Sequence, residues 1–415
     1  MTAHRPSRRS VLAAAGGFGL TLQFMATQSF AASEGELARK KLVVVICRGG
    51  MDGLSVAPPV ADPAYAGLRG AIAVTQGALR LDDTFALHPA LPSVHALAKA
   101  GQARIAPAAA TPDRARSHFE AQDVLESGAA AVYASQSGWL NRAVEAMRAS
   151  RKVDALSVGA TSPLILRGPA PASAWSPGEG LDTSARLPTL LQDLYRNDPV
   201  LSQALARGLA TDSMAQAAMS NLPVTPDVAM TAQPAGPSTA QLRRGEIAAK
   251  KLGQTLAGFM RNPGGPQVAA VSLDGFDTHA NQGGVQGQLA TRLAYLDALL
   301  SGLHTGLGPE WKDAVVLVAT EFGRTARVNG TQGTDHGTAS TAMLLGGALK
   351  PGGIVGDWPT LNPAALYENR DLAPTLDMRA LFKGVLADHM GVDRAALEKT
   401  VFPDSVAAKP VANLV

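Results

Sequence analysis

The stretch AVVLVATEFGRT, Ala314–Thr325, places an apolar run of strand length directly before a polar turn. A run that is apolar at every position predicts a strand buried on both faces, which is typical of a parallel sheet covered by helices. The turn that follows carries Glu321 and Arg324 around a glycine, although a surface turn needs the glycine alone. These charged side chains indicate a binding or catalytic site at the end of the strand.

The same pattern of an apolar run ending in a polar, glycine-containing turn recurs along the chain. The other runs are KLVVVIC (Lys41–Cys47), ARIAPAAA (Ala103–Ala110), QVAAVSL (Gln267–Leu273) and TAMLLGG (Thr341–Gly347). Between them, Leu289–Leu303 carries leucines at three- and four-residue spacing, which predicts a helix with one apolar face. Alternating strands and helices predict an α/β fold, with a doubly wound, mainly parallel sheet and helices on both faces. Ligands bind such sheets beyond the carboxyl ends of the strands.

Composition and periodicity also predict the remaining organisation. Asp377–Met390 has the pattern of a closing helix, with Gly391 as its C-terminal stop. Leu187–Leu209 has a helical pattern, and Thr211–Gln241 is rich in Ala, Met, Pro, Ser and Gln, which is typical of an inserted cap with mobile connections. We therefore expect a single domain over residues 32–415, with a helical and low-complexity insertion around residues 180–245.

The N-terminal residues have the order of an export signal. SRRSVL, Ser7–Leu12, is followed by an uncharged stretch over Val11–Ala32 that ends in small residues. The adjacent arginines and the weakly apolar stretch favour the twin-arginine export machinery. A membrane anchor is the alternative, but the glycines and glutamines of this stretch make a poor span. We expect residues 1–31 to be cleaved, leaving a periplasmic or secreted protein without a stable membrane span.

The charge balance excludes one class of partner. The formal charge of the whole chain is +3, but Arg5, Arg8 and Arg9 leave with the signal, so that 34 basic residues face 34 acidic ones. A near-neutral, aromatic-poor chain without a basic stripe argues against nucleic-acid binding. The single cysteine, Cys47, excludes an intramolecular disulfide and lies in an apolar run, where we expect a buried, inert thiol.

Acidic and imidazole side chains collect at the predicted strand ends. They are Asp52, His118, Asp274, Asp277, His279, Glu321, Asp335 and His336, with Ser117 beside the first histidine. Sets of Asp, Glu and His suit Zn²⁺, Mn²⁺ or iron, and a cation would relieve the repulsion between neighbouring carboxylates. Taken singly, each residue is more often a helix cap or a turn former. Their occurrence at successive strand ends favours a metal centre.

Several motifs in this order resemble those of the DUF1501 family of exported bacterial proteins. They are GGMDG (Gly49–Gly53), RSHFEAQDVLESG (Arg116–Gly128), GFDTHANQ (Gly275–Gln282), ATEFGRT (Ala319–Thr325), GTDHGTAS (Gly333–Ser340) and GGIVGDWP (Gly352–Pro359). That family resembles the alkaline phosphatase, sulfatase and phosphoglyceromutase superfamily. The resemblance covers nearly the whole chain after the signal. It implies a two-metal site at the carboxyl edge of the sheet.

The resemblance also implies roles for single residues. Asp52 matches the aspartate after the first strand that bridges toward one metal, and Ser117 stands where the superfamily places its nucleophile, at a helix N-terminus. Asp277 and His279 resemble the Asp and His pair of a metal site. Glu321 takes the place of a metal-binding aspartate, and His336, with Asp335 beside it, resembles the final metal-binding histidine.

The chain departs from the superfamily pattern at three points. Phe322 stands where phosphatases place a metal-binding histidine, and Asp277 and His279 are closer together than in phosphatases. Ser117 and His118 also compete for the reactive role: either Ser117 is the nucleophile, or His118 is a ligand or acid/base group and Ser117 only caps the helix. Arg324 and Arg116 are candidate contacts to an oxyanion, although either is equally expected as a solvated or ion-paired arginine, an alternative favoured for Arg116.

These residues predict an exported metal-dependent hydrolase of phosphate or sulfate esters. The expected cofactor is one or two divalent ions, with Zn, Mn or Ca as candidates. The expected partner is an anionic small molecule or a sulfated or phosphorylated glycan. The alternative is a catalytically degenerate cell-surface protein that binds metal or an anionic glycan, and the phenylalanine at position 322 keeps this alternative open.

Overall fold

The computed structural model describes residues 34–159, 162–177, 191–192, 194–195, 198–220 and 239–415. Residues Arg39–Val415 form one compact unit, and the short helix α2 (Glu34–Arg39) begins before it. The predicted signal, residues 1–31, lies outside the described residues, as does part of the predicted insertion. Among the described helices, none combines the length and the apolar character that a membrane crossing requires.

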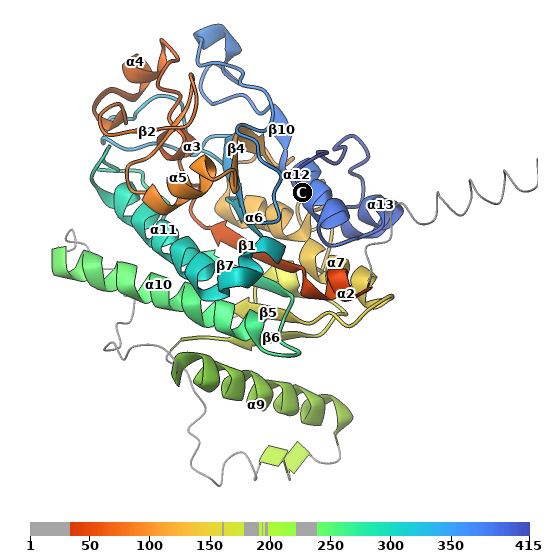
Figure 1. The fold of residues 1–415 in the computed structure, drawn as a ribbon. Helices are drawn as coiled ribbons and strands as arrows, with labels where there is room; N and C mark the ends of the chain where they lie inside the picture. The colour runs from red at the N-terminus through yellow and green to blue at the C-terminus, as the bar shows by residue number, and fades with distance from the viewer. Residues whose placement is uncertain (1–33, 160–161, 178–190, 193, 196–197, 221–238) are drawn as a thin grey trace, which may run out of the picture. The chain divides into compact units, whose positions relative to one another are not determined.

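The centre of the unit is an eight-stranded sheet in the order β10-β4-β9-β8-β1-β7-β5-β6 (Figure 1). The strands are β1 (Lys41–Cys47), β4 (Ala103–Ala110), β5 (Ala155–Val158), β6 (Ala172–Trp175), β7 (Val268–Leu273), β8 (Ala314–Ala319), β9 (Ser340–Leu345) and β10 (Leu376–Asp377). Neighbouring strands are parallel except at β9, which is antiparallel to both β8 and β4. The predicted α/β fold with a mainly parallel sheet is confirmed.

Strand β1 shows how the sequence builds the two layers of helices. Its alternate residues Val43, Val45 and Cys47 belong to one apolar cluster, and Leu42, Val44 and Ile46 belong to another. Side chains alternate between the faces of a strand, so both faces of the sheet are covered. Helices α5 (Pro92–Lys99), α10 (Thr239–Arg261) and α11 (Gln288–Leu307) supply the first cluster, with α10 and α11 side by side (Figure 1). Helices α6 (His118–Ser127), α7 (Trp139–Arg148) and α12 (Met378–Asp388) supply the second.

The remaining elements are short, apart from one long helix. The short ones are α3 (Gly53–Val56), α4 (Tyr65–Arg69), β2 (Leu79–Arg80), β3 (Ala86–Leu87), α13 (Arg394–Ala396), η1 (Gly70–Ile72), η2 (Leu164–Leu166), η3 (Gly308–Asp313), η4 (Pro363–Ala365) and η5 (Leu397–Val401). The long one is α9 (Pro199–Ser220), which packs against β6 and α10.

Most predicted elements are found with the expected bounds. The helix predicted over Leu187–Leu209 lies partly outside the described residues, and its last part belongs to α9. One strand differs in direction. The apolar run before Gly346 forms β9, which is antiparallel, because the chain returns from the turn around His336 instead of crossing over through a helix. The segment Thr211–Gln241, predicted as an insertion or cap with mobile connections, begins within α9 and ends within α10, and residues 221–238 lie outside the described residues. The insertion therefore stays a prediction.

The parallel arrangement decides where the polar turns lie. Strands β1, β4, β7 and β8 all run in the same direction, so the turns after them emerge at one edge of the sheet. The turn before β9 is held at the same edge by a backbone bridge between Arg324 and His336. Four segments that are distant in sequence therefore meet at one place, because the turn after β8 and the turn before β9 belong to one connection.

Candidate metal centre

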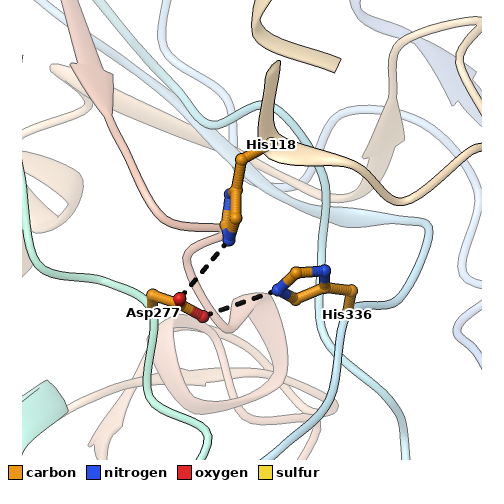
Figure 2. A group of neighbouring side chains, drawn as sticks. All are labelled: His118, Asp277 and His336. Carbon is orange, nitrogen blue, oxygen red and sulfur yellow. Dashed lines mark ion pairs between the residues drawn. The ribbon is translucent and has the colours of Figure 1, made fainter. Parts of the chain in front are cut away.

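Three side chains from separate segments converge at the carboxyl edge of the sheet: His118, Asp277 and His336. His118 is the first residue of α6, Asp277 follows β7, and His336 precedes β9. Figure 2 shows them pointing toward one another. His118 Nε2 lies 3.5 Å from one carboxylate oxygen of Asp277, and His336 Nε2 lies 3.6 Å from the other. One donor atom from each residue lies within 4.8 Å of the other two, a spacing that could hold a metal ion.

The second nitrogen of each imidazole is already engaged. His118 Nδ1 lies 2.8 Å from Glu321 Oε1, and His336 Nδ1 lies 2.8 Å from the carbonyl oxygen of Arg116. Both acceptors require a proton on Nδ1, and this leaves a lone pair on each Nε2 when the rings are neutral. His118 Nε2 is buried and has no hydrogen-bond partner among the described residues. Two imidazole lone pairs therefore face the Asp277 carboxylate.

Glu321 is fully buried and orients His118. Its Oε1 also accepts hydrogen bonds from the amide of Gly49 at 2.8 Å and from Gln122 Nε2 at 3.3 Å. Burial acts to raise the pKa of the Glu321 carboxyl, but these hydrogen bonds outweigh it and hold the pKa below its ordinary value. The bond to Glu321 in turn raises the pKa of His118. Glu321 thus bonds the far nitrogen of a candidate ligand, the position from which carboxylates orient metal-binding histidines in other proteins.

Arg324 is buried and holds the Asp277 carboxylate through a hydrogen-bonded ion pair. Its Nη2 donates to Asp277 Oδ1 at 2.6 Å, and its Nε donates to the carbonyl oxygen of Gly50 at 2.6 Å. Burial acts to raise the pKa of Asp277, but the ion pair with Arg324 outweighs it, so the pKa lies below its ordinary value. Asp277 therefore remains a carboxylate over the physiological pH range.

His279 and Asp335 lie at the exposed rim of this cluster. His279 Nε2 lies 3.0 Å from Asp277 Oδ1 and 2.9 Å from His336 Nε2. Asp335 Oδ1 lies 3.4 Å from His279 Nδ1 and accepts from Asn329 at 3.1 Å. The two imidazoles cannot both present lone pairs across 2.9 Å without a proton or a cation between them. His279 is thus placed to act as a further ligand, with Asp335 orienting it.

Phe322 is an apolar side chain that packs against the candidate centre. It is 4% exposed, and its ring lies 4.8 Å from the His118 ring and 4.7 Å from the His336 ring, between centroids. Gly50 makes this packing possible, because a Cβ at that position would lie 2.5 Å from the Phe322 ring. Phe322 therefore packs against two imidazoles of the candidate centre.

Asp52 lies in a separate buried network. Its Oδ2 forms a salt bridge with Arg69 and accepts from Ser55 Oγ at 2.7 Å and Gln282 Nε2 at 2.6 Å. Its Oδ1 is buried without a hydrogen-bond partner among the described residues. The guanidinium of Arg69 thus supplies the positive charge that this carboxylate requires. A direct metal contact by Asp52 stays a prediction.

Ser117 and Arg116 stand at the start of α6. Ser117 is the N-cap residue, half-buried, and no capping hydrogen bond from its side chain is formed among the described residues. Arg116 has a left-handed backbone (φ 59°) and pairs with Asp371 at 2.8 Å and Glu368 at 2.5 Å. The guanidinium is therefore ion-paired, one of the two arrangements expected for it. The nucleophilic role of Ser117 stays a prediction.

The chemistry of the donor set fits a divalent transition metal. Zn²⁺ with bonds of about 2.0–2.1 Å in a tetrahedral site separates its ligand atoms by about 3.4 Å, close to the two distances between imidazole and carboxylate in Figure 2. Two imidazoles and a carboxylate suit zinc or manganese better than calcium, which takes oxygen ligands. Burial also lowers the pKa of His336, which favours the neutral ring that a ligand must be.

Sequence reasoning missed the residues that support the centre from behind. Gln122 and Glu126 follow His118 at four-residue spacing along α6, a visible signal that one face of this helix is polar. Gln282 ends the GFDTHANQ motif, but nothing local indicates that its amide is buried. Arg69 gives no sequence signal at all, since its partner Asp52 is brought to it by the fold.

A family model described as "Protein of unknown function (DUF1501)" matches residues 39–401. Among curated proteins, none matches the sequence. Solved structures with a similar chain path include the C-terminal periplasmic domain of EcEptC from Escherichia coli in complex with Zn, at 10% identity and a TM-score of 0.33, covering 74% of this chain and 72% of that one.

Two other solved structures are similar at the same level. Ps i-CgsB has 11% identity and a TM-score of 0.40, over 89% of this chain and 77% of that one. A protein in the alkaline phosphatase superfamily from Vibrio parahaemolyticus has 10% identity and a TM-score of 0.34, over 77% of this chain and 62% of that one. These likenesses are too distant to transfer an activity.

Proposed function

The chain belongs to the DUF1501 family, and we propose that it is an exported, metal-dependent hydrolase of phosphate or sulfate esters. The observation that carries the proposal is the convergence of His118 Nε2 and His336 Nε2 on the Asp277 carboxylate, with each Nδ1 held by another acceptor. Such pre-oriented donors are the usual design of a catalytic metal site. His279, half-exposed at the rim, is the proposed further ligand.

The chemistry proposed for the site needs a Lewis acid and a nucleophile. A divalent ion bound to these ligands would polarise an ester oxygen and stabilise negative charge in the transition state. Ser117 directly precedes His118, and its hydroxyl is free of the capping bond that would otherwise occupy it. We assign Ser117 the role of nucleophile, since the exposed amides at the start of α6 favour a bound anion.

Arg324 has a different role in this proposal from the anion contact that its sequence position suggests. Its guanidinium is 1% exposed and donates to backbone carbonyls and to Asp277. A guanidinium whose nitrogens all donate to protein groups can hold the proposed ligand Asp277 in place. We therefore assign Arg324 to positioning the Asp277 carboxylate.

A second candidate function follows from the same observation. With the Arg324 donors engaged and Phe322 packed against two ligands, the described centre supports metal binding more directly than it supports binding of an anionic group. A protein that binds a metal, or an anionic glycan through it, without turnover is therefore the alternative. Activity separates the two candidates.

The export part of the proposal rests on SRRSVL, Ser7–Leu12, with its adjacent arginines. Replacement of Arg8 and Arg9 by lysines should leave the full-length protein in the cytoplasm of an expressing bacterium. The native protein should be recovered from the periplasm or the medium with its first 31 or so residues removed, as N-terminal sequencing would report.

The deciding experiment is the metal content of protein purified without chelator, measured by elemental mass spectrometry. His336→Ala and Asp277→Ala should lose the metal, and His95→Ala should keep it, because His95 bonds the carbonyl oxygen of Arg80 on a different element. The loaded protein is then assayed with p-nitrophenyl phosphate and p-nitrophenyl sulfate, beside Ser117→Ala.

Each result of this experiment has a defined meaning. Turnover that is lost in Ser117→Ala while metal is retained supports the hydrolase with Ser117 as nucleophile. Turnover that survives in Ser117→Ala removes Ser117 from the reaction. Metal without turnover of either ester supports the binding protein, and no metal after reconstitution with Zn²⁺ or Mn²⁺ rejects both candidates.

A further inference from the structure

Gln282 connects the turns that carry the candidate ligands to the interior of the protein. It is fully buried in the segment between β7 and α11. Its Oε1 accepts from Thr278 Oγ1 at 2.8 Å and from Thr334 Oγ1 at 2.7 Å. Its Nε2 donates to Asp52 Oδ2 at 2.6 Å and to Ser55 Oγ at 3.3 Å. All four polar contacts of this side chain are to buried groups.

The two threonines belong to the ligand-bearing turns. Thr278 stands between Asp277 and His279, and Thr334 is two residues before His336. The backbone also joins these turns, since the amide of Thr334 donates to the carbonyl oxygen of Thr278 at 3.2 Å. One carbonyl oxygen of Gln282 therefore fixes the spacing between the turns that supply Asp277 and His336.

The orientation of the Gln282 amide is determined by its partners. The Asp52 carboxylate accepts hydrogen bonds and cannot donate them, so Nε2 must face it and Oε1 must face the threonines. Asp52 is itself fixed by the buried ion pair with Arg69, whose Nη1 donates to the carbonyl oxygen of Thr325 at 3.2 Å. The hydrogen bonds of Gln282 are thus attached to an ion pair that is buried away from solvent.

We propose that Gln282 is a positioning residue of the metal centre. From the buried side of the two turns, its side chain sets the separation of Asp277 and His336. The inference rests on the proposed function in that it takes these residues to bind a metal. Groups of this kind matter because ligands must be held within about 0.5 Å of their working geometry. Loss of a supporting hydrogen bond typically weakens metal affinity by about 10–100-fold.

The test uses Gln282→Met, which keeps the length of the side chain and removes its hydrogen bonds. Zn²⁺ is titrated into metal-free protein, and amide hydrogen exchange is followed in the metal-free state at the bonds that join the turns. Those bonds are Thr334 to Thr278, Asn281 to Thr331 and Gln282 to Gln332. We expect Zn²⁺ affinity about 10–100-fold weaker and faster exchange in both turns.

A double-mutant cycle distinguishes a specific effect of the Gln282 hydrogen bonds from a general loss of stability. Thr334→Val removes one bond to Gln282 with little change of shape, so it should weaken Zn²⁺ binding, and its combination with Gln282→Met should be little worse than Gln282→Met alone. Thr341→Val is the matched control. It removes a buried hydroxyl that bonds the carbonyl oxygen of Gly53 at 2.9 Å and should leave Zn²⁺ affinity and exchange in the ligand turns unchanged.

Two results would overturn the inference. The first is wild-type exchange in both turns of Gln282→Met, and the second is wild-type Zn²⁺ affinity in that variant. If Gln282→Met fails to fold, wild-type Zn²⁺ affinity or wild-type exchange in Thr334→Val overturns the inference in its place. A wild-type protein that binds neither Zn²⁺ nor Mn²⁺ rejects the proposed function instead, and in that case the exchange data alone decide whether Gln282 holds the turns together.

Discussion

His118 Nδ1 lies 2.8 Å from Glu321 Oε1, across 203 residues of sequence. The imidazole lies at the start of α6, which follows β4, and the carboxylate directly follows β8. The two side chains meet because β4 and β8 end at the same edge of the sheet. It fixes the tautomer that leaves His118 Nε2 without a proton when the ring is neutral. Glu321, which the sequence predicts as a metal ligand, thus bonds the candidate ligand His118, and its direct contact with a metal stays a prediction.

Glu321→Gln should weaken Zn²⁺ binding while the protein stays folded. The amide oxygen can still accept from His118 Nδ1, but without the negative charge that strengthens the bond and raises the basicity of the ring. We expect affinity to fall by about 10-fold, measured by titration of metal-free protein. A loss as complete as that of His336→Ala would show instead that Glu321 contacts the metal directly.

The protein should bind about one divalent ion per chain. Asp52, the residue that the family resemblance places toward one metal of a two-metal site, is already neutralised by Arg69 in a fully buried pair. A second cation would face the guanidinium, which repels it. Elemental analysis of protein loaded with excess Zn²⁺ and then desalted tests this, and two equivalents that depend on Asp52 would contradict it.

Arg69→Gln should destabilise the fold strongly, because it leaves the Asp52 carboxylate buried without its countercharge. Breaking such a pair typically costs about 3–5 kcal/mol of unfolding free energy. The double variant Asp52→Asn with Arg69→Gln removes both charges and should recover much of that loss. Urea denaturation of the three proteins measures the coupling, and additive losses would mean that the two residues do not act as a pair.

Phe322→Ala should lower both stability and metal affinity. The ring is buried and packs against His118 and His336, so its removal leaves a cavity next to the ligands and costs about 3–5 kcal/mol. Phe382→Ala is the matched control, since Phe382 is also buried but stacks on Trp139 in the second apolar cluster, away from the candidate ligands. It should lose similar stability and keep wild-type Zn²⁺ affinity, and equal affinity losses in both variants would contradict a specific role for Phe322.

Stability should fall in acid because of His389. This residue is fully buried with Nε2 3.0 Å from the carbonyl oxygen of Lys41, and burial lowers its pKa from 6.5 to about 4. The unfolded chain therefore takes up a proton near pH 6.5 that the folded chain takes up near pH 4. The stabilisation is present above pH 6.5 and is lost as the pH falls toward 4, by up to about 3 kcal/mol.

His389→Gln isolates this contribution, because an amide can still donate to Lys41 without titrating. The difference in unfolding free energy between wild type and variant, measured by urea denaturation between about pH 4 and 7, should shrink as the pH falls. His95→Gln, at a partly exposed histidine, is the control and should follow the wild type. Parallel curves for wild type and His389→Gln would contradict the assignment.

The strands were predictable because their signal is local. Lys41–Cys47 and Ala103–Ala110 are strands with the predicted bounds, since a short, mostly apolar run between polar turns is typical of a buried strand. The helix at Leu289–Leu303 and the closing helix after Asp377 are confirmed for the same reason, as α11 and α12. The direction of β9 was not predictable, because direction depends on how a turn of irregular shape brings the chain back.

The members of the candidate centre were predictable as a set but not in their places. The sequence alone determined that acids and imidazoles follow successive buried strands, and parallel strands then bring those ends to one edge. Only the tertiary structure decided that His118, Asp277 and His336 face one another, that Glu321 stands behind His118, and that Arg69 neutralises Asp52. The physical reason is the distance along the sequence over which each signal acts. A burial pattern is visible in neighbouring residues, whereas a hydrogen bond joins whichever groups the fold brings within about 3 Å.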